Sequence, residues 1–341
     1  RKKFVVLENL KRPPKPGSKI YIGLSGGKDS ICLLHLIHSK VSSSKQDSAW
    51  NGINIKAVHV NHNLQTSSKK FELLCKETCQ NLGIELITIN LTINNELIKK
   101  FGLEAAARKE RLNAFKNLLK CKDDVLALGH HLDDQIETVF LQWMRGAGLE
   151  GLTGMLILDL KVVQDSVLKV WRPLLDTSRA EISKYVETHN LSWIEDPTNS
   201  DLEYDRNLIR HKVIPLLKLA RTGAPTAMAR SVQHLQSARL LLDNITCAAL
   251  KNCETKGYSK HIHAQNLSKL ELLKLDDILI SRVLRAWLNK MGCSSPPTKR
   301  LLEFIRQLRS SSKKTGSLIE VNGKNGYKII SKLDELTLTI K

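Results

Sequence analysis

Six consecutive residues, Ser25-Gly26-Gly27-Lys28-Asp29-Ser30, combine two flexible glycines with a cation, a carboxylate and two hydroxyl groups. Adjacent glycines let the backbone approach an anion closely. Apolar residues over 20–24 precede them and apolar residues at helical spacing over 31–37 follow, which predicts a strand, a turn and a helix. Because unpaired N–H groups and the dipole at a helix start attract negative charge, the segment is expected to bind phosphate. Its spacing fits neither a Walker A loop nor a dinucleotide fingerprint.

A second polar group, residues 129–138, carries two imidazoles and three carboxylates at a predicted strand end and helix start. Its members with chemically active side chains are His130, His131, Asp133, Asp134 and Glu137. Carboxylates suit Mg²⁺, which neutralises phosphate charge, and we expect Asp29 and Asp133 to be its ligands. His131 is expected to donate to a phosphate or to assist proton transfer. Helix capping alone would explain the acids at 133 and 134 but not the histidines.

Strands and helices alternate through the first half of the chain. Strands are predicted at 20–24, 53–60, 84–89 and 125–128, and helices at 31–37, 71–82, 97–119 and 133–143. This alternation predicts an α/β fold, a doubly wound parallel sheet, whose ligands bind beyond the carboxyl ends of the strands. Both polar groups follow predicted strand ends, so this fold would bring them to one edge of the sheet.

The pattern changes after residue 214. A long helix is predicted over 226–252, two further helical stretches over 278–291 and 298–308, and a small hairpin-containing sheet over 316–340. We therefore predict a catalytic domain over 1–214 and a mainly helical domain, with its linker helix, over 215–341.

Basic residues outnumber acidic ones by 53 to 34, which gives a formal net charge of +19. The excess is +6 over 1–214 and +13 over 215–341. A basic domain separate from the catalytic one suits a polyanion such as RNA, although a solvated basic surface is the simpler alternative. With 42% hydrophobic residues and no apolar run of membrane-spanning length, we expect a globular intracellular protein. Seven scattered cysteines favour reduced thiols over a disulfide framework.

The segment from Ser25 to Ser30 resembles the PP-loop of the ATP pyrophosphatases, which split ATP between the α and β phosphates and adenylate a carbonyl oxygen. Further motifs, in the same order along the chain, narrow the resemblance to the tRNA(Ile)-lysidine synthetase family. They are Leu103 to Arg111, Gly129 to Thr138, Arg145 to Leu152, Arg172 to Leu175 with Arg179, Trp193 to Asn199, and Tyr204 to Arg210. One departure is Gln65, where the family commonly has arginine, so the part that Gln65 plays in binding ATP or RNA stays open.

The resemblance implies that ATP activates the wobble cytidine of the CAU-anticodon isoleucine tRNA as an adenylate. Free L-lysine then displaces AMP and leaves lysidine, which changes codon specificity from AUG to AUA. ATP and Mg²⁺ are the implied cofactors. The implied ATP-binding residues are Ser25, Gly26, Gly27, Lys28, Asp29, Ser30 and His62. The implied catalytic residues are Asp29, Arg108, His131, Asp133, Asp134 and Glu137. The implied substrate-binding residues are Glu104, Arg108, Arg111, Arg145, Arg206 and Arg210.

Within that set, the resemblance places Glu104, Arg108 and Arg145 near the nucleobase and its activated carbonyl. The arginines at 206 and 210 are expected to stabilise the segment that contains Asp196 or to contact RNA. Lysine requires an acidic pocket, for which the three carboxylates of 129–138 are candidates.

Three other functions stay open at this point. A tRNA thiolase of the same superfamily would use a C-x-x-C pair, which the sequence lacks. An ATP-dependent amide synthetase for a small acid would leave the basic second domain without a use. A non-catalytic RNA-binding protein with an ATP fold conflicts with the complete motif over 25–30. We expect the protein in the bacterial cytoplasm, or in the stroma or matrix of an organelle, away from membranes, and the family allows a homodimer.

Overall fold

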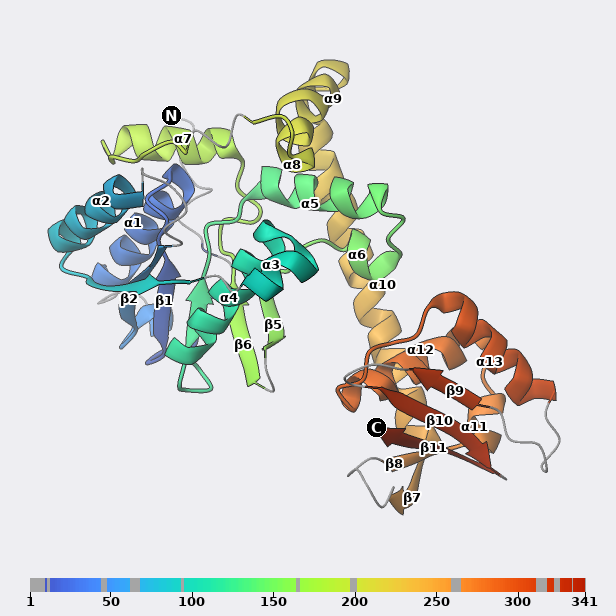
Figure 1. The fold of residues 1–341 in the computed structure, drawn as a ribbon. Helices are drawn as coiled ribbons and strands as arrows, with labels where there is room; N and C mark the ends of the chain where they lie inside the picture. Colours follow the sequence, from blue (N-terminus) through green and yellow to red (C-terminus); the bar gives the residue numbers. More distant parts are fainter. Residues whose placement is uncertain are drawn as a thin grey trace. The chain divides into compact units, whose positions relative to one another are not determined.

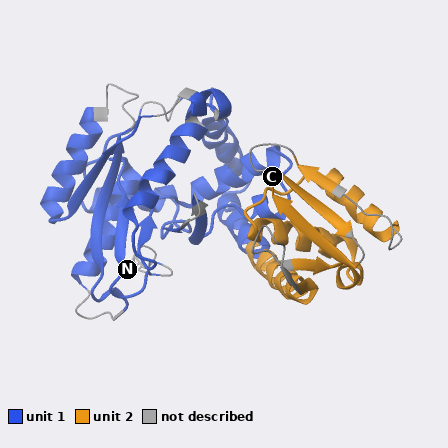
Figure 2. Cartoon of the chain, turned by 60° about the horizontal axis from the view of Figure 1, so that its bottom comes forward, with its two compact units in different colours: residues 1–235 blue, residues 236–341 orange. Residues whose placement is uncertain are grey.

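The computed structural model divides the chain into two compact units, residues 1–235 and residues 236–341 (Figure 2). It describes residues 10, 13–43, 48–61, 68–92, 95–163, 166–196, 201–258, 265–310, 318–321, 326–332 and 334–340. The chain passes from one unit to the other within helix α10 (Ala224–Cys253), which confirms the long helix predicted there. The end of the catalytic domain at residue 214 stays a prediction.

A six-stranded sheet forms the centre of the first unit (Figure 1). Its strands are β1 (Lys19–Gly23), β2 (Asn54–Asn61), β3 (Glu85–Asn90), β4 (Val125–Ala127), β5 (Leu158–Val163) and β6 (Ser166–Trp171), in the order β3-β2-β1-β4-β6-β5. Neighbouring strands are parallel except β5, which runs antiparallel to β6. The predicted α/β fold with a parallel sheet is confirmed, and the antiparallel edge strand adds to it.

The first unit also contains a set of helices, of which some cover the two faces of this sheet and others form a separate core. They are α1 (Lys28–Ser42), α2 (Ser68–Leu82), α3 (Asn95–Phe101), α4 (Leu103–Leu118), α5 (Leu132–Met144), α6 (Leu149–Leu152), α7 (Arg179–Thr188), α8 (Asp205–Leu208) and α9 (Ile214–Ala220), with a 3₁₀ turn at Ser48–Trp50 and a π-helical turn at Ile209–Val213. Successive residues of β1 point to opposite faces. Accordingly, Ile20 and Ile22 pack in one core with α1, α2 and α7, whereas Tyr21 packs in another with Phe115 of α4.

The single helix predicted over 97–119 is wrong. The chain forms two helices there, α3 and α4, separated by Gly102. Gly102 has a φ of +81°, a left-handed conformation that side-chain-bearing residues rarely adopt, and it is the N-cap of α4. The glycine therefore ends one helix and lets the next begin in a new direction.

The second unit holds a five-stranded sheet and three short helices (Figure 1). These elements are β7 (Glu254–Tyr258), β8 (Gln265–Ser268), α11 (Lys269–Leu273), α12 (Asp277–Lys290), α13 (Thr298–Ser310), β9 (Leu318–Val321), β10 (Tyr327–Lys332) and β11 (Glu335–Ile340). Trp287, Phe304 and Tyr327 are buried in its core. The sheet predicted over 316–340 is confirmed and is larger, because β7 and β8 join it in the order β7-β8-β11-β10-β9. Residues 322–325, where an Asn-Gly turn was predicted, lie outside the described residues.

Over the described ranges, no helix combines the length and the apolar character needed to cross a membrane. All seven cysteines lie within those ranges and none forms a disulfide, as predicted.

A histidine and tyrosine cluster joins α1 to α7. His35 Nδ1 lies 2.8 Å from the Tyr185 hydroxyl, and the ring of His189 lies 5.0 Å from that of His35 and 4.0 Å from that of Tyr185. Burial, together with the nearby His189 and His38, lowers the pKa of His35 from its usual 6.5. His35 is therefore neutral in the folded protein at a pH where the unfolded chain already binds a proton.

Stability should consequently fall as the pH drops below about 6.5, since the unfolded state then binds more protons than the folded state. Replacing His35 with glutamine, which keeps hydrogen-bonding capacity but does not titrate, should reduce the loss of unfolding free energy between pH 7 and pH 5. Urea denaturation at both pH values measures this, with exposed His234→Gln as the control. If the unfolding free energy of His35→Gln fell between pH 7 and pH 5 as much as that of the unmodified protein, His35 would not be a cause of the loss.

Candidate active site

The turn between β1 and α1 is held by two serine hydroxyls. The Ser30 hydroxyl accepts a hydrogen bond from the Ser25 N–H at 3.1 Å and donates one to the Gly27 carbonyl at 2.9 Å. The two hydroxyls also lie 3.1 Å apart. Gly27 is the N-cap of α1 and provides no side-chain hydrogen bond to that helix. In the first turn, the Ser30 N–H donates to the Gly27 carbonyl at 3.1 Å. The N–H groups of Lys28 and Asp29 lie before the first helical hydrogen bonds and are left to an anion, as phosphate binding requires.

Lys28 and the segment after α7 brace this turn from one side. The Lys28 ammonium donates to the Ser183 hydroxyl at 3.1 Å and lies 4.3 Å from the centre of the Trp193 ring. The Ile194 N–H donates to the carbonyl of Gly26, whose φ of +85° requires glycine. In this conformation the Lys28 charge is held by a hydroxyl and an aromatic face.

Asp29 and His131 join the PP-loop to the start of α5. His131 is buried, and its Nε2 lies 3.7 Å from Asp29 Oδ2. His131 is also the N-cap of α5: its Nδ1 accepts the Asp134 N–H at 3.4 Å, while Asp134 Oδ2 accepts the His131 N–H at 3.0 Å. Because Nδ1 accepts, the neutral imidazole carries its proton on Nε2, which lies 3.5 Å from Asp134 Oδ2 and 3.7 Å from Asp29 Oδ2. The pair thus places a hydrogen-bond donor and a carboxylate beside the PP-loop.

The close packing of the two segments depends on Gly129. A Cβ at this position would lie 3.0 Å from the carbonyl oxygen of Asp29, a backbone atom that cannot move aside easily. The absence of a side chain at residue 129 therefore favours the close packing of the segment after β4 against the start of α1.

Glu137 is fully buried and is paired with two arginines from 206–210. Arg206 Nε donates to Glu137 Oε2 at 2.7 Å, and Arg210 Nε donates to Oε1 at 2.6 Å. Both guanidinium groups also reach Asp134 Oδ1 at 3.3 Å. Arg206 and Arg210 are therefore paired with the acids of α5, and their contact with RNA or with the segment that contains Asp196 stays a prediction.

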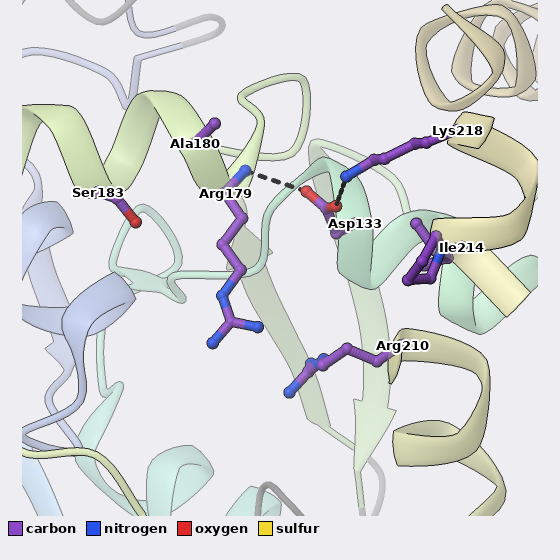
Figure 3. Close-up of a pocket in the computed structure, with 8 residues that line it drawn as sticks. Asp133, Arg179, Ala180, Ser183, Arg210, Ile214 and Lys218 are labelled. Carbon is purple, nitrogen blue, oxygen red and sulfur yellow. Dashed lines mark hydrogen bonds and ion pairs between the residues drawn. The ribbon is translucent and has the colours of Figure 1, made fainter. Parts of the chain in front are cut away.

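Asp133 takes part in a different set of contacts (Figure 3). Its Oδ2 accepts the backbone N–H of Arg179 at 3.0 Å, and its Oδ1 lies 3.6 Å from the Lys218 ammonium. Sequence reasoning gave no role to Lys218, although it is the one charged residue of the otherwise apolar α9. Although Asp133 and Glu137 are four residues apart on one helix, their carboxylates contact different residues.

Asp29 is the carboxylate best suited to a metal ion. Its Oδ1 is buried without a hydrogen-bond partner among the described residues, and burial raises the pKa of the carboxyl. An unpartnered carboxylate oxygen beside a phosphate-binding turn fits Mg²⁺, which commonly takes one or two carboxylates together with phosphate and water. Across the described ranges no group of three or more His, Cys, Asp or Glu side chains is placed to hold a metal. Because both Asp133 oxygens contact other groups, its role as a second ligand stays a prediction.

The arginines of α4 lie near two basic side chains, Arg172 and His130, whose pKa values are lowered. Burial lowers the pKa of Arg172, and the positive charge of Arg108 lowers it further. Burial also lowers the pKa of His130; Asp134 opposes this, while charges that include Arg111 add to it. His130 is therefore neutral at pH 7. Arg108 and Arg111 themselves are exposed, on a helix that faces this part of the site.

The remaining predicted residues are not brought into the cluster by any described contact. Arg145 is exposed at the C-cap of α5. Glu104 lies in the first turn of α4, but its side chain is outside what the structure describes. His62 and Gln65 also fall outside the described residues.

Replacing Ser30 with alanine should weaken ATP binding about fivefold. The change removes the acceptor of the Ser25 N–H and the donor to Gly27, and a lost hydrogen bond costs about 1 kcal/mol. Titration calorimetry with ATP tests this, and Ser39→Ala, at an exposed position of the same helix, is the control. Equal ATP affinities for the two variants would contradict a structural role for the Ser30 hydroxyl in the loop.

Two known families match the chain. Residues 3–217 match the family described as PP-loop domain, and residues 267–329 match the family described as TilS substrate binding domain. Among solved structures, the U34-tRNA thiolase NcsA from Methanococcus maripaludis aligns with a TM-score of 0.53 and 22% identity. The alignment covers 67% of this chain and 76% of the thiolase chain, and at 22% identity it supports the fold alone.

Curated relatives extend the match across both units. The tRNA(Ile)-lysidine synthase of Nitrosomonas europaea is 35% identical over 302 residues, which are 89% of this chain and 61% of that protein. The tRNA(Ile)-lysidine synthase of Legionella pneumophila strain Paris is 34% identical over 295 residues, 86% of this chain and 63% of that protein. The chain therefore spans about three fifths of the length of these relatives. Because the PP-loop family covers most of the chain and the relatives carry one name, the protein belongs to the PP-loop family and its resemblance to the tRNA(Ile)-lysidine synthetases is confirmed.

Proposed function

We propose that this protein uses ATP to join free L-lysine to the wobble cytidine of the CAU-anticodon isoleucine tRNA, through an adenylated cytidine, and so changes the codon read from AUG to AUA. The supporting observation is the 3.7 Å approach of His131 to Asp29, which unites a phosphate-binding turn with a second polar cluster. The TilS substrate binding match over 267–329 supports tRNA as the partner.

In the first step, the N–H groups at the start of α1 hold the phosphates of ATP. Asp29 would hold Mg²⁺, which when bound neutralises charge on the departing pyrophosphate. The His131 Nε2–H donates to a phosphate oxygen beside Asp29, and its orientation is fixed in advance by the α5 cap. The cytidine carbonyl oxygen bonds to the α phosphorus, and the bond to the β-phosphate oxygen breaks.

In the second step, the lysine amine bonds to the activated ring carbon, the carbon–oxygen bond to AMP breaks, and the amine loses a proton. The chain contributes mainly by holding the two reactants at reacting distance. Arg108, Arg111 and Arg145 are exposed and suit contacts with the RNA around the cytidine. Arg206 and Arg210 are assigned a supporting role, because Glu137 holds both.

The test is incorporation of radiolabelled lysine into tRNA. The protein is incubated with ATP, Mg²⁺ and labelled lysine, and with transcripts of the CAU-anticodon isoleucine tRNA and the elongator methionine tRNA in separate reactions. We expect label only in the isoleucine tRNA. Absence of label, together with pyrophosphate release in the presence of a sulfur donor, would instead favour a thiolase.

We propose that the reaction takes place in the cytoplasm, or in the stroma or matrix of an organelle. We also propose a homodimer, which light scattering would test.

A further inference from the structure

Strand β5 forms an edge of the six-stranded sheet and pairs with β6 on one side (Figure 1). Its Leu158 and Leu160 are exposed, and so is Val167 on β6, with Leu160 61% and Val167 62% exposed. The pairing of β5 with β6 places these three side chains on the same face of the sheet. A strand edge with exposed apolar side chains is a template for pairing with another strand, so this edge is a candidate interface.

The hydrogen bonds around β6 show which backbone groups of β5 point outward. The Arg172 N–H donates to the carbonyl of Ile157, the residue opposite it, at 2.7 Å. On the other side of β6, the Trp171 carbonyl accepts a hydrogen bond of 2.9 Å from the segment after β4. Hydrogen-bonded and non-hydrogen-bonded pairs alternate along an antiparallel ladder. The N–H and carbonyl groups of residues 158, 160 and 162 therefore point away from β6, toward the open edge.

The charges of β5 are complementary to those of a second, antiparallel β5. When the pairing is centred on Leu160, the outward-pointing residues of the two strands oppose one another, and each Asp159 faces a Lys161 of the second copy. Shifting the pairing by two residues in either direction also matches the backbone groups. It would, however, bring Asp159 against Asp159 or Lys161 against Lys161, and like charges directly opposite are unfavourable. The charges thus select the one register that is symmetric about Leu160.

We propose that two copies of this chain associate through antiparallel pairing of their β5 strands, centred on Leu160. The outward backbone groups of each strand hydrogen-bond to those of the other, and the exposed leucines of the two copies cover one another. Asp159 and Lys161 already form an ion pair of 2.9 Å within one chain, and the contact joins two such pairs into a network. This inference rests on the proposed homodimer, to which it gives an interface, and it does not depend on the ligation of lysine.

The contact leaves the candidate active site of each copy open. β5 is separated from β1, the strand that leads into the PP-loop, by β4 and β6. Because the two β5 strands run in opposite directions, the carboxyl ends of the parallel strands in the two copies also point in opposite directions. The PP-loops therefore lie at opposite edges of the joined sheet, away from the contact.

Charged side chains on an edge strand can instead prevent pairing. That protection is most effective where like charges meet, whereas the register centred on Leu160 brings unlike charges together. A strand from a different protein would pair with the same backbone groups, but the match of Asp159 to Lys161 is a property of two identical strands. The charge pattern therefore favours a second copy of this chain as the partner.

The experiment measures association by sedimentation velocity at protein concentrations from about 1 to 100 µM, the range suited to a small interface. We expect the unmodified protein to form dimers and Lys161→Glu to raise the Kd of the dimer about tenfold or more, because both facing charge pairs become repulsive. The control is Lys70→Glu, at an exposed lysine of α2, which should leave the Kd unchanged. Lys161→Glu keeps the 3.5 Å contact of Asp159 with Arg172, so the first unit should still fold.

A mixture of two variants tests the register itself. Asp159→Lys should also dimerise poorly alone, but an equimolar mixture of Asp159→Lys and Lys161→Glu should form dimers again, because the two strands then carry opposite charges at the facing positions. Melting temperatures of both variants check that each is folded. Dimers of Lys161→Glu as stable as those of the unmodified protein would overturn this interface while leaving the homodimer standing.

Amide hydrogen exchange resolved by residue gives an independent readout. The outward amides of residues 158, 160 and 162 should exchange more slowly as the protein concentration rises, whereas the amides of 159 and 161, which face β6 within one chain, should not change. A protein that stays monomeric at every concentration would overturn both the interface and the homodimer. Incorporation of lysine into the isoleucine tRNA should differ less than twofold between Lys161→Glu and the unmodified protein, and its absence from both would refute the proposed reaction without affecting this interface.

Discussion

Replacing Glu137 with alanine is expected to lower the free energy of unfolding by about 3–5 kcal/mol. Glu137 is fully buried and holds Arg206 and Arg210 through three hydrogen bonds of 2.6–3.0 Å. Its removal would leave Asp134 as the remaining carboxylate partner of the two guanidinium groups among the described residues. Urea denaturation measures the change.

The matched control is Glu77→Ala, which removes the same charge from an exposed position of α2 and should change stability by no more than about 0.5 kcal/mol. Glu137→Gln should fall between the two, since it keeps an acceptor but not the charge. If Glu137→Ala were as stable as Glu77→Ala, the buried pairs would contribute nothing to folding.

Replacing Asp29 with asparagine should reduce activity strongly without reducing stability. We expect tRNA-dependent pyrophosphate exchange to fall by about 10²-fold, because the carboxylate beside the phosphates is lost. Stability should be unchanged or slightly higher. Asp29 Oδ1 has no hydrogen-bond partner among the described residues, and burial raises the pKa of the carboxyl, so its negative charge is unfavourable in the folded state.

Calorimetry and exchange kinetics on the same Asp29→Asn preparation separate these effects. The raised pKa of Asp29 gives the same expectation for stability. A carboxyl whose pKa is raised on folding destabilises the protein at pH values above its usual 3.8, and asparagine removes that penalty. A large drop in melting temperature would show that Asp29 holds the loop together instead of serving the reaction.

The PP-loop and its flanking elements could be predicted because their signals are local. The adjacent glycines at 26 and 27, the apolar strand before them and the helical periodicity after them all lie within a short stretch of sequence. The cap of α5 was predicted only in part: capping was expected to explain the acids at 133 and 134 but not the histidines, whereas His131 is itself the N-cap. Fold class followed from the alternation of such local signals.

The partners of Glu137 could not be predicted in this way. Arg206 and Arg210 lie 69 and 73 residues further along the chain, and which acid they meet depends on how α8 and the π-helical turn pack against α5.

The β5 strand was missed for another reason. Its apolar Leu158 and Leu160 are exposed and alternate with Asp159 and Lys161 at the sheet edge, a pattern without the buried character of the central strands.

The residues that cap α5 contribute both to folding and to the proposed reaction, and this affects how the activity of related proteins can be inferred from their sequences. His131 and Asp134 satisfy each other's backbone groups and so begin a helix on which the buried Glu137 depends, whether or not any reaction takes place. A descendant that had lost its activity would still be under selection to keep them for folding. The described contacts give Asp29 no such second role, since its buried Oδ1 has no hydrogen-bond partner among them. When active copies must be told from pseudoenzymes, the residue at position 29 is therefore the more informative one to inspect.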